Sequence, residues 1–153
     1  MRTLGPGRLH RLLADAEAVT WALLLIGMAL KYLTSTTDLG VTIAGPIHGF
    51  VFLLYCVSTV VVGIDQRWRA GTIVLGLASA IPPFATIPFE RWVRRNGLAG
   101  PQWRLRSSGG DRSVVERALA EVLRRPVRFV LVAVAVTALV FRVMLWVGPP
   151  GGA

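Results

Sequence analysis

The stretch VTIAGPIHGFVFLLYCVSTVVVGI, residues 41–64, contains no Asp, Glu, Lys or Arg and decides the fold class. An α-helix needs about 20 mainly apolar residues to cross the hydrocarbon core of a bilayer. Further apolar stretches run over residues 14–33, 70–89 and 127–147. A soluble chain of 153 residues has too little interior to bury four such helices. We therefore predict an all-α, polytopic membrane helix bundle with four transmembrane helices in the bacterial plasma membrane.

The third stretch, residues 70–89, differs from the others because Pro82, Pro83 and Pro88 interrupt it. Proline inside a membrane helix frees backbone groups that neighbouring helices can satisfy. Two interpretations stay open, a Pro-broken span and a re-entrant hairpin. Its length favours the span.

A polar segment separates the third stretch from the fourth. Its first half has linker composition, and its second half predicts a short amphipathic interfacial helix over residues 114–125. Ser113 and Glu116 match a capping box, in which each side chain accepts a hydrogen bond from the other residue's backbone N–H. The predicted organisation is a three-helix membrane domain (1–95), a basic linker (96–125), and a fourth helix with a short tail (126–153). The apolar face of the amphipathic helix comprises Val115, Leu119, Val122 and Leu123.

The net charge is +9, of which +6 lies between Glu90 and Arg128, where ten Arg stand against four acidic residues. Positively charged loops stay in the cytoplasm, so we predict a cytoplasmic linker. Four spans then put both termini outside, whereas a re-entrant hairpin puts the N-terminus inside. Arginine beside tryptophan next to membrane spans favours anionic lipid headgroups over nucleic acid as the partner. The arginines expected to contact headgroups are Arg91, Arg94, Arg95, Arg104, Arg106, Arg117, Arg124 and Arg125.

Three polar residues, Lys31, His48 and Glu90, reach one membrane level in the four-span arrangement. We interpret them as a polar cluster on the cytoplasmic side that ties helix ends together. The alternative is a proton-handling or anion-binding site, because histidine titrates near neutral pH. Glu17 is interpreted as a carboxylate that complements the dipole at the N-terminus of the first helix. His10 is taken to precede that helix.

No sequence motif indicates an enzyme, and no metal site or cofactor is predicted. There is no Walker loop, no H-x-x-x-H pair and no C-x-x-C, and the single Cys56 is interpreted as an apolar filler. The leading hypothesis is a small, non-enzymatic accessory or interaction subunit that binds another membrane protein or forms a homo-oligomer. The alternatives are a minimal proton-coupled transporter or carrier using His48 and Lys31, and a membrane enzyme.

Four segments with ordered spacing resemble a bacterial integral-membrane family, domain of unknown function 3817, over residues 8–95. These segments are EAVTW (17–21), MALKY (28–32), GPIHG (45–49) and PFAT (83–86). Ala29 and Ala85 depart from the pattern, which has Pro and Gly there. The resemblance implies a membrane fold and no particular activity. The positions that match the family pattern, besides Lys31 and His48, are Glu17, Tyr32, Gly49, Tyr55, Pro83 and Phe84.

Overall fold

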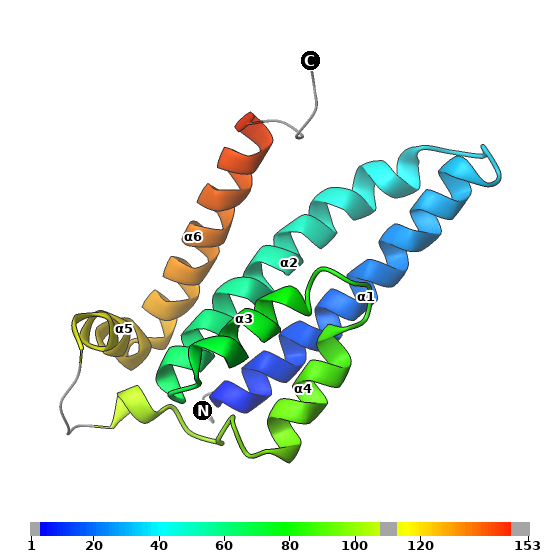
Figure 1. Cartoon of the computed structure of the whole chain (residues 1–153). Coiled ribbons are helices and arrows are strands. Elements are labelled where there is room, and N and C mark those ends of the chain that lie inside the picture. Colours follow the sequence, from blue (N-terminus) through cyan, green and yellow to red (C-terminus); the bar gives the residue numbers. More distant parts are fainter. Residues whose placement is uncertain (1–3, 108–112, 148–153) are drawn as a thin grey trace.

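The structure is a computed structural model that describes residues 4–107 and 113–147. Within these ranges every regular element is helical, which confirms the all-α prediction (Figure 1). The predicted tail beyond residue 147 lies outside the described residues. The elements are α1 (Pro6–Tyr32), α2 (Leu39–Asp65), α3 (Ala70–Ala78), α4 (Thr86–Arg95), the 3-10 helix η1 (Arg104–Arg106), α5 (Val114–Arg124) and α6 (Pro126–Val147).

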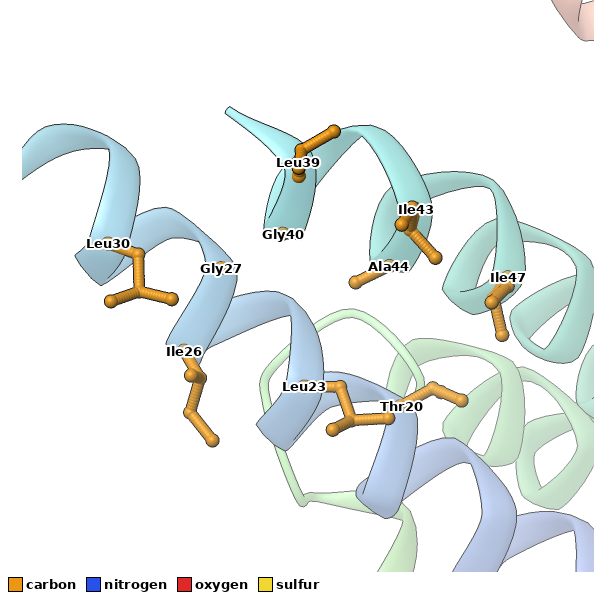
Figure 2. Close-up of a pocket in the computed structure, with 10 residues that line it drawn as sticks. All are labelled: Thr20, Leu23, Ile26, Gly27, Leu30, Leu39, Gly40, Ile43, Ala44 and Ile47. Atoms are coloured by element: carbon orange, nitrogen blue, oxygen red, sulfur yellow. The ribbon is translucent and has the colours of Figure 1, made fainter. Parts of the chain in front are cut away.

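The two long helices α1 and α2 form an antiparallel pair, and both are long and apolar enough to cross a membrane. Their backbones touch where Gly27 faces Gly40, beside an apolar pocket of about 330 Å³ (Figure 2). A Cβ atom at Gly27 would lie 2.7 Å from the carbonyl carbon of Gly40. Gly45, which the sequence pairs with Gly49 in a G-x-x-x-G motif, has no atom within 4 Å of its Cβ direction.

The third predicted span is not one continuous helix, because the structure divides this stretch into α3 and α4. The nine residues of α3 extend only about 14 Å, too short to cross. Pro82 and Pro83 follow in the turn, where the missing proline N–H groups prevent the helix from continuing. Phe84 then adopts a positive φ of 65°, which bulky residues rarely do, and α4 runs back. The α3–α4 hairpin therefore starts and finishes at the end of the bundle where α1 begins (Figure 1).

Residues 96–107 are not the loose linker that their composition suggests. They lie across the end of the bundle and bond to the ends of α1 and α2. The Gln66 side chain accepts a hydrogen bond from the Gly100 N–H over 2.9 Å. The Trp103 indole N–H donates to the Leu4 carbonyl over 2.7 Å. This segment therefore forms a cap that fixes the helix ends.

The cap is locked by Asp65, whose side chain is fully buried at the end of α2. The Asp65 carboxylate accepts hydrogen bonds from the backbone N–H groups of Leu105 (2.9 Å) and Arg104 (3.1 Å). The Arg104 guanidinium in turn donates to the carbonyls of Asp65 and Ile64, and to the Glu116 carboxylate. One arginine thus joins α2, η1 and α5.

The predicted amphipathic helix and its capping box are confirmed in α5. The Ser113 hydroxyl accepts from the Glu116 N–H (3.2 Å), and the Glu116 carboxylate accepts from the Ser113 N–H (3.0 Å). Leu123 is buried against the cap, whereas the side chain of Val122 lies outside the described part. The next helix, α6, begins at Pro126 as predicted and runs along α2, where Gly49 lies against the Phe141 ring.

Candidate functional site

The three residues predicted to form one cluster are not brought together. Lys31 lies at the α1–α2 turn with its Nζ 3.6 Å from the Asp38 carboxylate. His48 lies within α2, and Glu90 lies on α4 with its carboxylate 3.9 Å from Arg94 Nε. The physical reason is the hairpin, which returns α4 to the end of the bundle opposite Lys31.

A different group of polar side chains is buried between α1, α2 and the α3–α4 hairpin. We call it the polar core. Each member is less than 9% exposed, although most of the surrounding residues are apolar. Its members are His10, Glu17, Thr20, His48, Tyr55, Thr59 and Thr86.

Glu17 lies at the centre of the polar core and is fully buried. Its Oε2 accepts a hydrogen bond from the Thr86 hydroxyl over 2.7 Å, which ties α4 to α1. The indole N–H of Trp21, one turn further along α1, interacts with this carboxylate. Neither that N–H nor Glu17 Oε1 makes a hydrogen bond of full geometry among the described residues. The interpretation of Glu17 as a helix-dipole carboxylate is wrong, because α1 begins about three turns earlier, at Pro6.

His48 joins the polar core through Thr20. Its Nδ1 lies 3.0 Å from the Thr20 hydroxyl, which itself donates to the Glu17 carbonyl over 2.9 Å. A hydroxyl has one proton to donate, so His48 Nδ1 carries the hydrogen in this pair. The ring also packs on Trp21 and Phe52, at centroid distances of 4.4 Å and 6.3 Å.

His10 closes the other end of the polar core and lies inside α1, not before it as predicted. Its ring is 1% exposed and packs against Tyr55, Trp68 and Phe89. Nε2 lies 3.5 Å from the Thr59 hydroxyl, and Nδ1 has no partner in the described structure. Sequence reasoning missed this role, yet the spacing of His10 and Glu17, two turns apart on one helix face, was a usable signal.

Three positions that match the family pattern shape the α3–α4 hairpin or join it to α2. The Tyr55 hydroxyl lies 3.2 Å from the Ser79 hydroxyl at the end of α3. Pro83 and Phe84 form the turn that follows. Tyr32 lies away from the hairpin: it is 68% exposed and next to Lys31 at the far end of α1.

Basic residues gather at the end of the bundle that carries the cap. Only Lys31 and Arg142, among the basic residues that the structure describes, lie towards the opposite end. Arg2 and Arg112 lie outside the described residues. The thirteen at the basic end are Arg8, Arg11, Arg67, Arg69, Arg91, Arg94, Arg95, Arg104, Arg106, Arg117, Arg124, Arg125 and Arg128.

Two of the arginines expected to contact headgroups are used inside the protein instead. Arg104 bonds to α2 and Glu116, and Arg106 Nε donates to the Leu123 carbonyl over 2.7 Å. The other six are exposed. The hydrogen bond from Arg104, reinforced by the Ser113 N–H, lowers the pKa of Glu116 below its ordinary value.

No metal centre emerges from residues 4–107 and 113–147, where no three His, Cys, Asp or Glu side chains are grouped to hold an ion. A second, basic pocket of about 460 Å³ opens between the start of α1 and the end of α4. Its polar lining comprises Arg8, His10, Arg11, Glu90 and Arg94.

Two relatives are similar to this chain, and both carry names as membrane proteins. A protein of Streptomyces coelicolor is 52% identical over 86 residues, which are 56% of this chain and 10% of that protein. The uncharacterized membrane protein YdzA of Bacillus subtilis is 33% identical over 72 residues, which are 47% of this chain and 74% of that protein. The chain thus spans about a tenth of the Streptomyces protein's length.

No solved structure matches this chain. The family described as Domain of unknown function (DUF3817) matches residues 7–95, which include α1 to α4 and all seven members of the polar core. The chain therefore belongs to the DUF3817 family of membrane proteins, as its sequence resemblance predicted.

Proposed function

We propose that this protein is a non-enzymatic membrane module with three crossings, α1, α2 and α6, and a re-entrant α3–α4 hairpin. The 22 residues of α6 extend about 33 Å, enough to cross a hydrocarbon core of about 30 Å. The gathering of thirteen arginines at one end supports a cytoplasmic basic end. The N-terminus is then cytoplasmic and the C-terminus external. This replaces the expectation of two external termini, which required the third stretch to cross.

Cysteine labelling tests this topology, because Cys56 is the single cysteine and one substitution removes it. In a Cys56→Ala background, an impermeant maleimide added to intact cells should label Ser35→Cys. It should label Asn96→Cys only after permeabilisation. Ile81→Cys, at the exposed hairpin turn, should stay unlabelled from outside. Labelling of Ile81→Cys as strong as that of Ser35→Cys would show that the third stretch crosses.

The role we propose for the module is to associate with other membrane proteins. The observation that carries this proposal is that a segment 52% identical to this chain makes up 10% of a much longer Streptomyces membrane protein. The same kind of helical unit is therefore a small part of the Streptomyces protein and about three quarters of the Bacillus protein. A unit that is physically linked to different lengths of membrane protein is suited to an accessory role.

Affinity purification of the tagged chain in mild detergent, followed by mass spectrometry, tests the accessory role. We expect one membrane protein at near-equal stoichiometry with the chain. Gly71→Ala, which alters an open surface position, should leave the recovery unchanged. Recovery of the chain alone, or only as a homo-oligomer, would contradict the proposal.

A second candidate function, proton-coupled transport, is favoured by one observation. Glu17 is a fully buried carboxylate without a basic partner among the described ion pairs, and ionisable groups inside membranes commonly mark proton pathways. Lys31 does not contribute to this candidate, because it pairs with Asp38 outside the polar core. In liposomes containing a pH-sensitive dye, proton flux should disappear in Glu17→Gln and persist in Asp15→Asn, an exposed carboxylate on the same helix. Absence of flux in the unaltered protein would eliminate this candidate.

A further inference from the structure

The basic pocket between α1 and α4 has the charge of an anion site. Three guanidinium groups, from Arg8, Arg11 and Arg94, border it, against the single carboxylate of Glu90. Its volume of about 460 Å³ falls within the range of about 300–1,000 Å³ typical of small-molecule sites.

These arginines retain hydrogen-bond donors for a ligand. Arg8 makes no ion pair with any described residue. Arg11 and Arg94 contact Asp15 and Glu90 only through Nε, at 3.8 Å and 3.9 Å. Their Nη groups are therefore available, and the planar guanidinium suits two-point binding of phosphate oxygens.

A second observation at this site is the side chain of His10. It is 1% exposed, it lines the pocket, and its Nδ1 has no hydrogen-bond partner among the described residues. A buried polar nitrogen without a partner is costly, and a ligand oxygen in the pocket would relieve that cost.

The start of α1 adds to the positive potential. Gly5 caps the helix without a side-chain hydrogen bond, and the first turn carries no acidic residue. Pro6 has no N–H and the Gly7 N–H already donates to the Gly100 carbonyl over 3.3 Å, so the contribution is that of the helix dipole, which no carboxylate in the first turn opposes.

We infer that the basic pocket binds the phosphate group of an anionic phospholipid, held by Arg8, Arg11 and Arg94 with His10 in its wall. Val93, Ala99 and Pro101 line the apolar part of the pocket and suit the glycerol backbone. The exposed Trp92, beside Glu90 on α4, suits the headgroup level of a bilayer. The lipid source rests on the proposed function, which puts this end of the bundle at the cytoplasmic headgroups.

Native mass spectrometry of the full chain in neutral detergent tests the inference, with phosphatidylglycerol and phosphatidylcholine as probes. We expect one phosphatidylglycerol to bind, and phosphatidylcholine to bind more weakly because its choline cation opposes the arginines. Arg8→Gln should weaken phosphatidylglycerol binding about fivefold or more, since a charge-assisted hydrogen bond is lost. The control is Arg69→Gln, an exposed arginine at the same end of the bundle without an ion pair in the described structure, and it should change binding less than about twofold.

Three results would overturn the inference. Equal losses in Arg8→Gln and Arg69→Gln would show that only net charge matters. Absence of phosphatidylglycerol binding would remove the site. Binding of inorganic phosphate that depends on Arg8, without binding of the lipid, would assign the pocket to free phosphate. The cysteine labelling tests the topology separately. If it puts the basic end outside the cell, the proposed topology is refuted, but Arg8-dependent lipid binding in micelles is unaffected.

Discussion

Gly27→Ala should loosen the contact between the two long helices by a measurable amount. An added Cβ would lie 2.7 Å from the Gly40 carbonyl carbon and 3.0 Å from the Val41 nitrogen, whereas ordinary contacts begin near 3.4 Å. The obstructing atoms belong to the backbone, so no side-chain rotation relieves the clash. The helices must separate by about 0.7 Å at this point, and overpacking of this kind costs about 1–3 kcal/mol.

Replacing glycine by alanine also favours the helix by about 0.5–1 kcal/mol, which would mask part of the clash. Gly71→Ala supplies the matched control, because a Cβ at Gly71 in α3 meets nothing within 4 Å. The difference between the two free energies of unfolding, from detergent titrations followed by tryptophan fluorescence, isolates the clash. Gly40→Ala should resemble Gly27→Ala, and the double variant should lose less than the sum because the helices have already separated. Equal stabilities of Gly27→Ala and Gly71→Ala would refute the reasoning.

Three further predictions concern buried and capping groups. Glu17→Gln should lower the melting temperature less than Glu17→Leu, because glutamine still accepts the Thr86 hydroxyl; equal losses in a thermal scan would contradict this. Ser113→Ala should destabilise α5 by about 1 kcal/mol, seen as faster amide exchange confined to that helix. Arg104 lowers the pKa of Glu116, so ionised Glu116 stabilises α5 fully at pH values above 4.5, the ordinary pKa. This stabilisation is lost as the pH falls through the lowered pKa. Amide protection factors in α5, which correct for the intrinsic effect of pH on exchange, should therefore fall at acid pH in the unaltered chain, while Glu116→Gln should show no such fall.

Local patterns predicted the elements whose signals lie within one segment. The uncharged run at residues 41–64 nearly coincides with α2, Leu39–Asp65. The Ser113 and Glu116 pair started α5 where the capping box requires, and Pro126 opened α6. Each depends on residues within a few positions of one another, so the sequence alone contains the necessary information.

The hairpin and the polar core could not be predicted in the same way. Residues 70–89 have the length and apolarity of a span, and only the turn at Pro82 and Pro83 decides that the chain goes back. Glu17 and Thr86 are 69 residues apart, so their hydrogen bond becomes visible only when α4 lies against α1. The expected position of Glu90 beside Lys31 depended on one continuous helix over this stretch, and the structure puts Glu90 on α4 instead.

The α3–α4 hairpin leaves the direction of the chain unchanged, since it returns to the end of the bundle from which it started. A helix that crosses the membrane inverts the orientation of every later helix, whereas a hairpin that returns to its own side leaves that orientation unchanged. An ancestor without it would have kept α6 in the same orientation, provided that the cap could still reach across the bundle. Gain or loss of such a hairpin therefore does not change the membrane orientation of the helices that follow. Residues could be added to the polar core in this way without inverting α6.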